Sequence, residues 1–196
     1  MPILERTDEQ LLDIAKTVEQ LTKSPSLNKT YWANGYISWQ NFPGKIPDDR
    51  EGHTAMIHSY MEPTWDVAVL DKTKPTFTFN EISAKTVSHR DSSWVIDEGK
   101  CEQSLRHEQG HFDITEVFTR KFIVHAQSMI GKEYPATQSE TINLESRLQV
   151  IRTWDYVNQS RIEFQCAYET VTQNGVDLPQ QIASEKQISD LLKSKN

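Results

Sequence analysis

The character of the sequence changes near residue 100, and this change constrains the fold more than any other feature. Between Tyr31 and Val95, short runs of β-branched and aromatic residues alternate with turn-forming residues, a pattern typical of β-strands. From Lys100 onward, apolar residues recur with the period of an α-helix. Strands followed by helices indicate an α+β fold.

The predicted elements divide the chain into a helix with a linker over 1–30 and a domain over 31–196. A helix is predicted over 6–23, with Thr7 as its N-cap. The predicted strands are Tyr36–Trp39, Thr54–Tyr60, Trp65–Leu70, Thr76–Ile82 and Ser93–Ile96, and the later helices span about 101–130, 138–172 and 179–193. We expect a small antiparallel or mixed sheet packed on helix 101–130, with further C-terminal helices behind it.

Composition narrows the classes of partner. The 21 Lys and Arg against 28 Asp and Glu give a net charge of −7, which disfavours a nucleic-acid partner. No apolar run approaches the roughly 18 residues of a membrane span. We expect the aromatic group Tyr31, Trp32, Tyr36 and Trp39 to belong to the core. The oligomeric state stays open.

The motif H-E-x-x-H at 107–111 carries the chemistry. On a helix, His107 and His111 lie one turn apart on one face, where two imidazoles can share a Zn²⁺ ion. Glu108 lies about 100° further round, so its carboxylate can reach a water on the metal without binding the metal. This is the arrangement of zinc metalloproteases, in which the glutamate is the general base.

The alternative is a surface helix with two incidental histidines. Ile114, Phe118 and Phe122 continue the histidine face, so this face is expected to point into the protein. A buried histidine pair is costly unless it is hydrogen-bonded or bound to a metal, which favours the metal site.

The segment 107–114, HEQGHFDI, resembles the signature of a bacterial family of predicted secreted zinc-dependent proteases, catalogued mainly as a domain of unknown function. Segments 39–44 (WQNFPG) and 168–175 (YETVTQNG) resemble looser motifs of that family, and the similarity spans about 36–190. This chain has Asn41 and Glu169 where the family has Asp, and Asn174 where it has His. The resemblance implies a zincin-like fold, a Zn²⁺ cofactor and a peptide or protein substrate.

A catalytic zinc ion usually has three protein ligands, so a third must come from elsewhere in the chain. Glu169 is the first choice, because a carboxylate suits zinc and the residue lies in the family-like segment. Weaker candidates are Glu163, Glu140, Glu145 and Asn174, whereas Asp113 and Glu116 are expected to face away from the metal. Tyr168 is a candidate donor to the oxyanion; the alternative is an ordinary buried or surface aromatic residue.

These residues predict a zinc-dependent peptidase in which Glu108 takes a proton from the attacking water. A strand within 76–96 is expected to pair with an extended substrate. Two alternatives remain. One is a non-catalytic binding protein of zincin fold with a structural or lost metal, and the other is a metal-dependent amidase acting on a non-protein substrate.

Two observations point to different cellular compartments for the protein, so its location stays open. The family resemblance implies a periplasmic or secreted protein, whereas the acidic, amphipathic N-terminus is not a signal peptide and indicates the cytosol if Met1 is the native start. In an exported protein, Cys101 and Cys166 can form a bridge between the motif helix and the helix of Glu169. In a reducing compartment, we expect both cysteines to be buried and to pack as small apolar residues.

Overall fold

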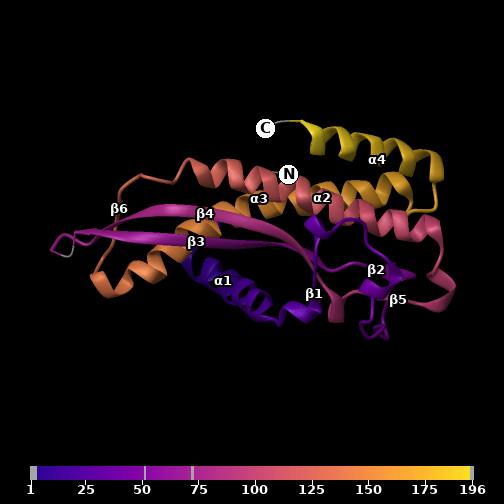
Figure 1. The fold of residues 1–196 in the computed structure, drawn as a ribbon, viewed down its shortest axis with the longest axis horizontal. Coiled ribbons are helices and arrows are strands. Elements are labelled where there is room, and N and C mark those ends of the chain that lie inside the picture. The colour runs from indigo at the N-terminus through magenta and orange to yellow at the C-terminus, as the bar shows by residue number, and fades with distance from the viewer. Residues whose placement is uncertain (1–3, 51, 72, 195–196) are drawn as a thin grey trace. The chain divides into compact units, whose positions relative to one another are not determined.

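The computed structural model describes residues 4–50, 52–71 and 73–194, which form an α+β fold (Figure 1). The helices and strands, in chain order, are α1 (Asp8–Lys23), β1 (Lys29–Tyr31), β2 (Ala55–Met56), β3 (Ser59–Asp71), β4 (Thr76–His89), β5 (Trp94–Val95), α2 (Glu102–Gln127), β6 (Tyr134–Pro135), α3 (Ile142–Thr172) and α4 (Leu178–Lys193). Single-turn 3₁₀ helices interrupt the connecting segments.

The strands form a larger and a smaller sheet. In the larger one the order is β1-β4-β3, and β6 pairs with the Thr76 end of β4. β1 runs antiparallel to β4, with Tyr31 opposite Val87. The smaller sheet is the antiparallel pair β2–β5, with Ala55 opposite Val95.

The described residues form two compact units. Unit 1 takes the residues up to Lys23, Glu62–Ala84 and Arg120–Ser160, and unit 2 takes Ser24–Met61, Lys85–Thr119 and the residues from Arg161 on. The division at residue 30 that the sequence predicts stays a prediction.

In unit 1, helix α1 contributes the buried side chains of Leu11, Ala15 and Val18 to the core. Its aromatic cluster consists of Phe77 and Phe79 from β4 with Tyr134 from β6, with ring centroids 5.4–5.6 Å apart. Burial of these side chains removes apolar surface from water, which stabilises the unit.

The core of unit 2 joins the smaller sheet to the motif helix. The buried side chains in contact are Ile37, Phe42, Ala55, Ile57, Val95 and Phe112, of which Phe112 belongs to α2. Trp32, Trp39 and Leu105 pack against them. A small antiparallel sheet therefore packs on the H-E-x-x-H helix, as the sequence predicts.

The helix predictions are confirmed to within a few residues at each end. The Thr7 side chain accepts the Gln10 N–H at 3.3 Å, and the Gln10 side chain accepts the Thr7 N–H at 3.0 Å. Thr7 is therefore the N-cap of a reciprocal capping arrangement.

Two strand predictions are wrong in part or whole. The predicted strand Tyr36–Trp39 contains no strand, because the Ile37 N–H donates to the Gln109 side chain instead of a ladder. The predicted strand Thr54–Tyr60 is broken at 57–58, where the N–H groups of Ile57 and His58 donate to the side chains of Glu108 and Ser93. Side-chain acceptors have replaced backbone partners at both places.

The aromatic group is also only partly in the core. Trp32 and Trp39 are half-buried against it, but Tyr36 is 91% exposed. The predicted bridge between Cys101 and Cys166 is not formed, and both thiols are free and exposed. The alternative of two buried cysteines is therefore wrong as well.

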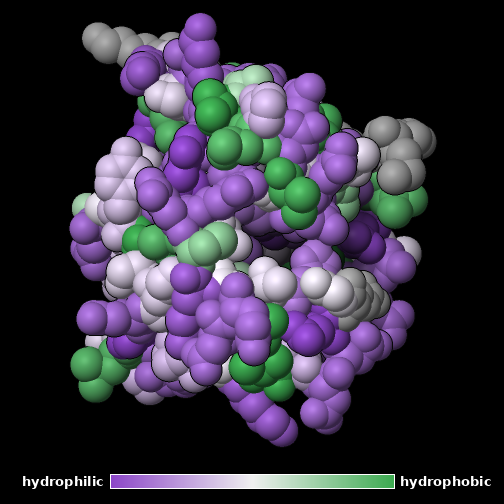
Figure 2. Space-filling view, turned by 90° about the vertical axis from the view of Figure 1, so that its right-hand side faces the viewer, coloured by the Kyte–Doolittle hydropathy of each residue, from purple (hydrophilic) through white to green (hydrophobic). Residues whose placement is uncertain are grey.

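The face that Figure 2 presents is mostly hydrophilic, and its apolar side chains are scattered. Scattered apolar residues of this kind are ordinary on a protein surface. Within the described ranges, no helix combines the length and apolar character that crossing a membrane requires.

Replacing Asp177 by alanine is expected to lower the free energy of unfolding by about 1 kcal/mol. Asp177 is the N-cap of α4, and its side chain accepts the Gln180 N–H at 3.1 Å. Urea unfolding measures the change. Asp190→Ala, at an exposed position of the same helix, is the control and is expected to change stability by less than about 0.5 kcal/mol; equal losses in both variants would contradict the capping role.

Candidate metal centre

The two motif histidines lie side by side on the buried face of α2. Their Nε2 atoms are 3.2 Å apart, and both residues are less than a tenth exposed. Ile114, Phe118 and Phe122 on the same helix are buried as well. The prediction that the histidine face points inward is confirmed.

Glu169, on α3, completes the group. Its Oε2 lies 3.1 Å from His107 Nε2 and its Oε1 lies 3.0 Å from His111 Nε2. One ligand atom from each of the three residues lies within 4.8 Å of the others. Burial alone would raise the pKa of Glu169, but hydrogen bonds and charge from the two histidines hold that pKa well below its ordinary value.

Among the described residues, the carboxylates of Glu140, Glu145 and Glu163 do not join this group, and Asn174 is exposed in the turn after α3. Glu145 accepts hydrogen bonds from Thr137 and Thr141 instead. Asp113 and Glu116 face away, as predicted: Asp113 accepts from Trp32, and Glu116 accepts from Thr86 at 2.7 Å. Among the described residues, the geometry therefore selects Glu169 from the set that the sequence left open.

Glu108 is buried beside the histidines, and its Oε2 accepts the Ile57 N–H at 2.7 Å. Burial raises the pKa of this carboxyl, and the neighbouring histidines and the Ile57 N–H oppose that rise. The bond to Ile57 fixes the direction of the carboxylate. It also accounts for the break between β2 and β3.

Tyr168 packs flat on the His107 ring, with centroids 4.8 Å apart and planes 12° apart. Its hydroxyl donates to the His107 carbonyl at 3.3 Å. Burial, followed by nearby carboxylates, raises the pKa of this phenol. In this structure Tyr168 positions His107, and its role as a donor to the oxyanion stays a prediction.

Gly110 makes room for Tyr168. A Cβ atom at Gly110 would overlap Tyr168 Oη and would lie 2.7 Å from Cζ. Only a residue without a side chain leaves this space, so α2 and the end of α3 can approach closely at this point.

The end of α3 holds His107 from a second side. Gln173, Asn174 and Gly175 all have positive φ, at 49°, 55° and 80°. A Cβ atom at Gly175 would lie 2.8 Å from His107 Cγ. The Asn174 N–H donates to the Glu169 carbonyl at 2.9 Å, so the turn and the third candidate ligand belong to one hydrogen-bonded unit.

A small cavity of about 190 Å³ opens beside these groups. It is lined by the segment 52–55, by His107 and Glu108, and by the end of α3 at Gln173 and Asn174. Glu108 and a histidine therefore share a space that a small chemical group can enter.

The donor set fits a divalent cation. The described group holds two buried imidazoles and one half-buried carboxylate, and the buried carboxylate of Glu108 lies beside it. Buried carboxylates are costly without a compensating charge, and a divalent cation supplies it. In one respect His107 differs from most ligating histidines. Such a histidine usually donates a hydrogen bond from the ring nitrogen that does not bind the metal, but His107 Nδ1 is buried without a hydrogen-bond partner among the described residues.

Sequence reasoning missed Ile57, Gly110 and Gly175. The glycine inside the helical motif is itself a signal, because glycine in a helix interior costs stability and usually marks a close approach. Nothing in the sequence spacing indicates the close approach of Gly175 to His107.

Comparison of the chain with protein-family models, with curated proteins and with solved structures finds no match. The geometry of the site therefore carries the functional argument alone.

Proposed function

We propose that the chain is a zinc-dependent peptidase of zincin-like fold, in which His107, His111 and Glu169 hold Zn²⁺ and Glu108 is the general base. The observation that carries the proposal is the convergence of the three donor residues within 4.8 Å, with Glu108 buried beside them. The HEQGHFDI resemblance agrees with it, and membership of that family is part of the proposal.

The donor types favour zinc. Two imidazole nitrogens and one carboxylate are a ligand set of catalytic zinc sites, which leave a position open for water or substrate. Calcium and magnesium prefer sites made of oxygen ligands. A zinc ion bound at this group would lower the pKa of a coordinated water and polarise a carbonyl oxygen.

Residues of the chain would carry out the proton transfer and would position the metal ligands. Glu108, held by the Ile57 N–H, would accept a proton from the attacking water and pass it to the leaving amine. Tyr168 packs on the His107 ring, and Gly175 lies close to the same ring. Burial of Glu108 and the two histidines limits access of bulk water, which strengthens the charge interactions between them.

A peptide substrate is favoured by the backbone beside Glu108. β3 pairs with β4 along one edge, whereas β1 and β6 pair only with residues 87–89 and 76–77 of that strand, so the pairing of substrate within 76–96 stays a prediction. Among the described strands, β2 pairs with β5 alone, so its other edge could accept an added strand. The start of β2 lines the cavity that contains Glu108, so an extended peptide along this edge would pass the site.

A second candidate is the metal-dependent amidase. The cavity of about 190 Å³ is smaller than pockets that enclose drug-sized ligands, so it accepts only a small group in full. A short acyl amide fits such a space without pairing to β2. Parallel assays on unstructured peptides and on short acyl amides separate the two activities.

The metal is tested by its content and affinity. Protein purified without chelator or affinity-tag metal is expected to carry one zinc ion per chain by plasma mass spectrometry. His107→Ala and Glu169→Ala are each expected to weaken zinc binding by about 100-fold or more, since each removes one of the three proposed ligands.

His125→Ala is the matched control. His125 lies on the same helix but is exposed and packs edge-on against Tyr156, outside the donor group. Its removal is expected to leave zinc affinity unchanged. Absence of zinc, with no uptake from added zinc salt, would contradict the metal site; bound zinc without hydrolysis of any peptide or amide would favour the binding-protein alternative.

A further inference from the structure

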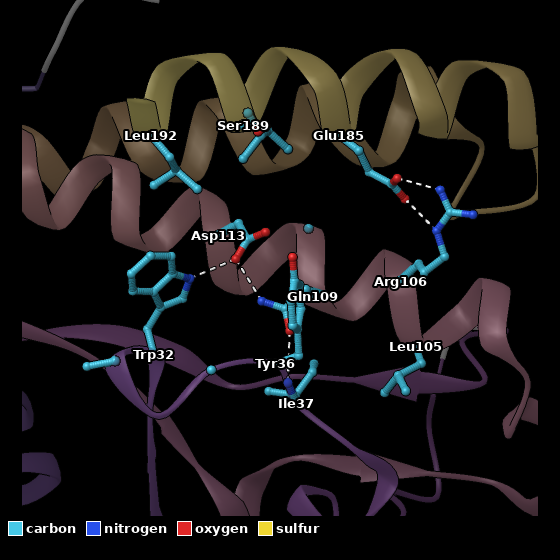
Figure 3. A pocket seen from close by; sticks show the side chains of 14 residues that line it. Trp32, Tyr36, Ile37, Leu105, Arg106, Gln109, Asp113, Glu185, Ser189 and Leu192 are labelled. Carbon is cyan, nitrogen blue, oxygen red and sulfur yellow. Dashed lines mark hydrogen bonds and ion pairs between the residues drawn. The ribbon is translucent and has the colours of Figure 1, made fainter. Parts of the chain in front are cut away.

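A second pocket, of about 680 Å³, lies on another face of the motif helix (Figure 3). It is enclosed by the segment 32–37, by α2 and by α4, all within unit 2. Its apolar wall includes Trp32, Ile37, Leu105, Ile188 and Leu192. Its volume lies within the range of pockets that bind small organic molecules.

This pocket is separate from the metal centre. Asp113, on its wall, lies about 240° round α2 from His107, and Arg106 and Gln109 flank it on the same face. None of the three metal-ligand candidates lines it. A ligand here would leave Glu108 and its cavity free.

One carboxylate oxygen in the pocket is held ready to accept a hydrogen bond. Asp113 Oδ1 accepts from Trp32 Nε1 and from Gln109 Nε2, both at 2.7 Å. Gln109 Oε1 in turn accepts the Ile37 N–H at 2.9 Å, which fixes the amide. Asp113 Oδ2 receives no hydrogen bond from the described part of the chain, and the network fixes its direction (Figure 3).

The charge of the wall favours a cation. The ionisable lining residues are two carboxylates, Asp113 and Glu185, and one guanidinium, Arg106, so with all three ionised one negative charge remains. Arg106 is already paired with Glu185 through both Nε and Nη2. Trp32 and Tyr36 add aromatic surface, which also attracts cations.

We propose that this pocket binds a small organic ammonium compound, whose apolar body packs against Trp32, Ile188 and Leu192 and whose N–H group donates to Asp113 Oδ2. An anion would be repelled by the same carboxylate. A neutral compound of equal shape would lack the charge-assisted hydrogen bond.

The test compares two probes that differ by one charge. Dansylcadaverine carries an apolar ring system and a primary ammonium, and its N-acetyl derivative carries a neutral amide. Fluorescence anisotropy with the full chain is expected to show binding of the amine about tenfold or more tighter than that of the acetyl derivative. Asp113→Asn, which keeps an acceptor for Trp32 and Gln109, is expected to abolish this preference.

Two further variants make the result specific to the pocket. Ser189→Phe adds a ring at the α4 wall and is expected to block both probes. His107→Ala, on the other face of α2, is expected to leave binding of both probes unchanged, which separates this proposal from the metal site. Equal affinities of the two probes, a preference that survives in Asp113→Asn, or no binding of either probe would overturn the proposal.

Discussion

Glu108→Gln is expected to lower hydrolysis by about 100-fold or more, because a general base contributes roughly 10²–10⁴-fold to the rate. Glutamine keeps an oxygen that can accept the Ile57 N–H, so the segment between β2 and β3 should keep its position. Zinc content is expected to be unchanged, since Glu108 is not in the donor group. Activity on a peptide and metal content measured on the same preparation check both statements.

Glu102→Gln is the control for the loss of a carboxylate. Glu102 is exposed in the first turn of the same helix and does not line the cavity beside Glu108. Its activity is expected to match that of the unmodified chain. Full activity in Glu108→Gln would rule out the general base, whereas loss of zinc from that variant would mean that Glu108 supports the metal group structurally.

Gly110→Ala is expected to destabilise the protein by about 1–3 kcal/mol, against the usual effect of this change in a helix. Alanine in a helix interior normally stabilises by about 1 kcal/mol relative to glycine. Here the new methyl group would overlap the Tyr168 hydroxyl, and Tyr168 is buried with its ring on His107. Thermal or urea unfolding gives the sign of the change.

A double-mutant cycle identifies the cause. In a Tyr168→Ala background the overlap is gone, so Gly110→Ala is expected to become neutral or stabilising by up to about 1 kcal/mol. If the cost of Gly110→Ala is the same in both backgrounds, the close approach of α2 to Tyr168 is not its cause. In Gly110→Ala alone, the displaced Tyr168 ring should also hold His107 less firmly, so this variant is expected to bind zinc more weakly.

The long helices could be predicted because each carries a sustained apolar period, whose signal outweighs local exceptions. The strands were less predictable. Residues 36–39 and 57–58 have strand-forming side chains, but the N–H groups of Ile37, Ile57 and His58 donate to side chains from distant parts of the chain, namely Gln109, Glu108 and Ser93. A local pattern contains no information on such partners.

The same limit applies to the metal centre. His107, Glu108 and His111 follow from helical spacing alone, because they lie within two turns. Glu169 is 62 residues from His107, and only the family-like segment around it favoured it over other glutamates. Its approach to both histidines depends on how α3 packs against α2 in unit 2, which the sequence pattern does not specify.

The turn after α3 has a consequence for recognising divergent relatives. The number of residues between Glu169 and Gly175 is constrained. Glu169 contacts the histidines from helix α3, and Gly175 lies close to the His107 ring in the turn that follows. An insertion between them would break one of these two contacts. Relatives too distant for whole-chain comparison should therefore keep two short motifs, H-E-x-G-H and, further on, Y-E with a G six residues after the E, even where every residue between the two motifs has changed.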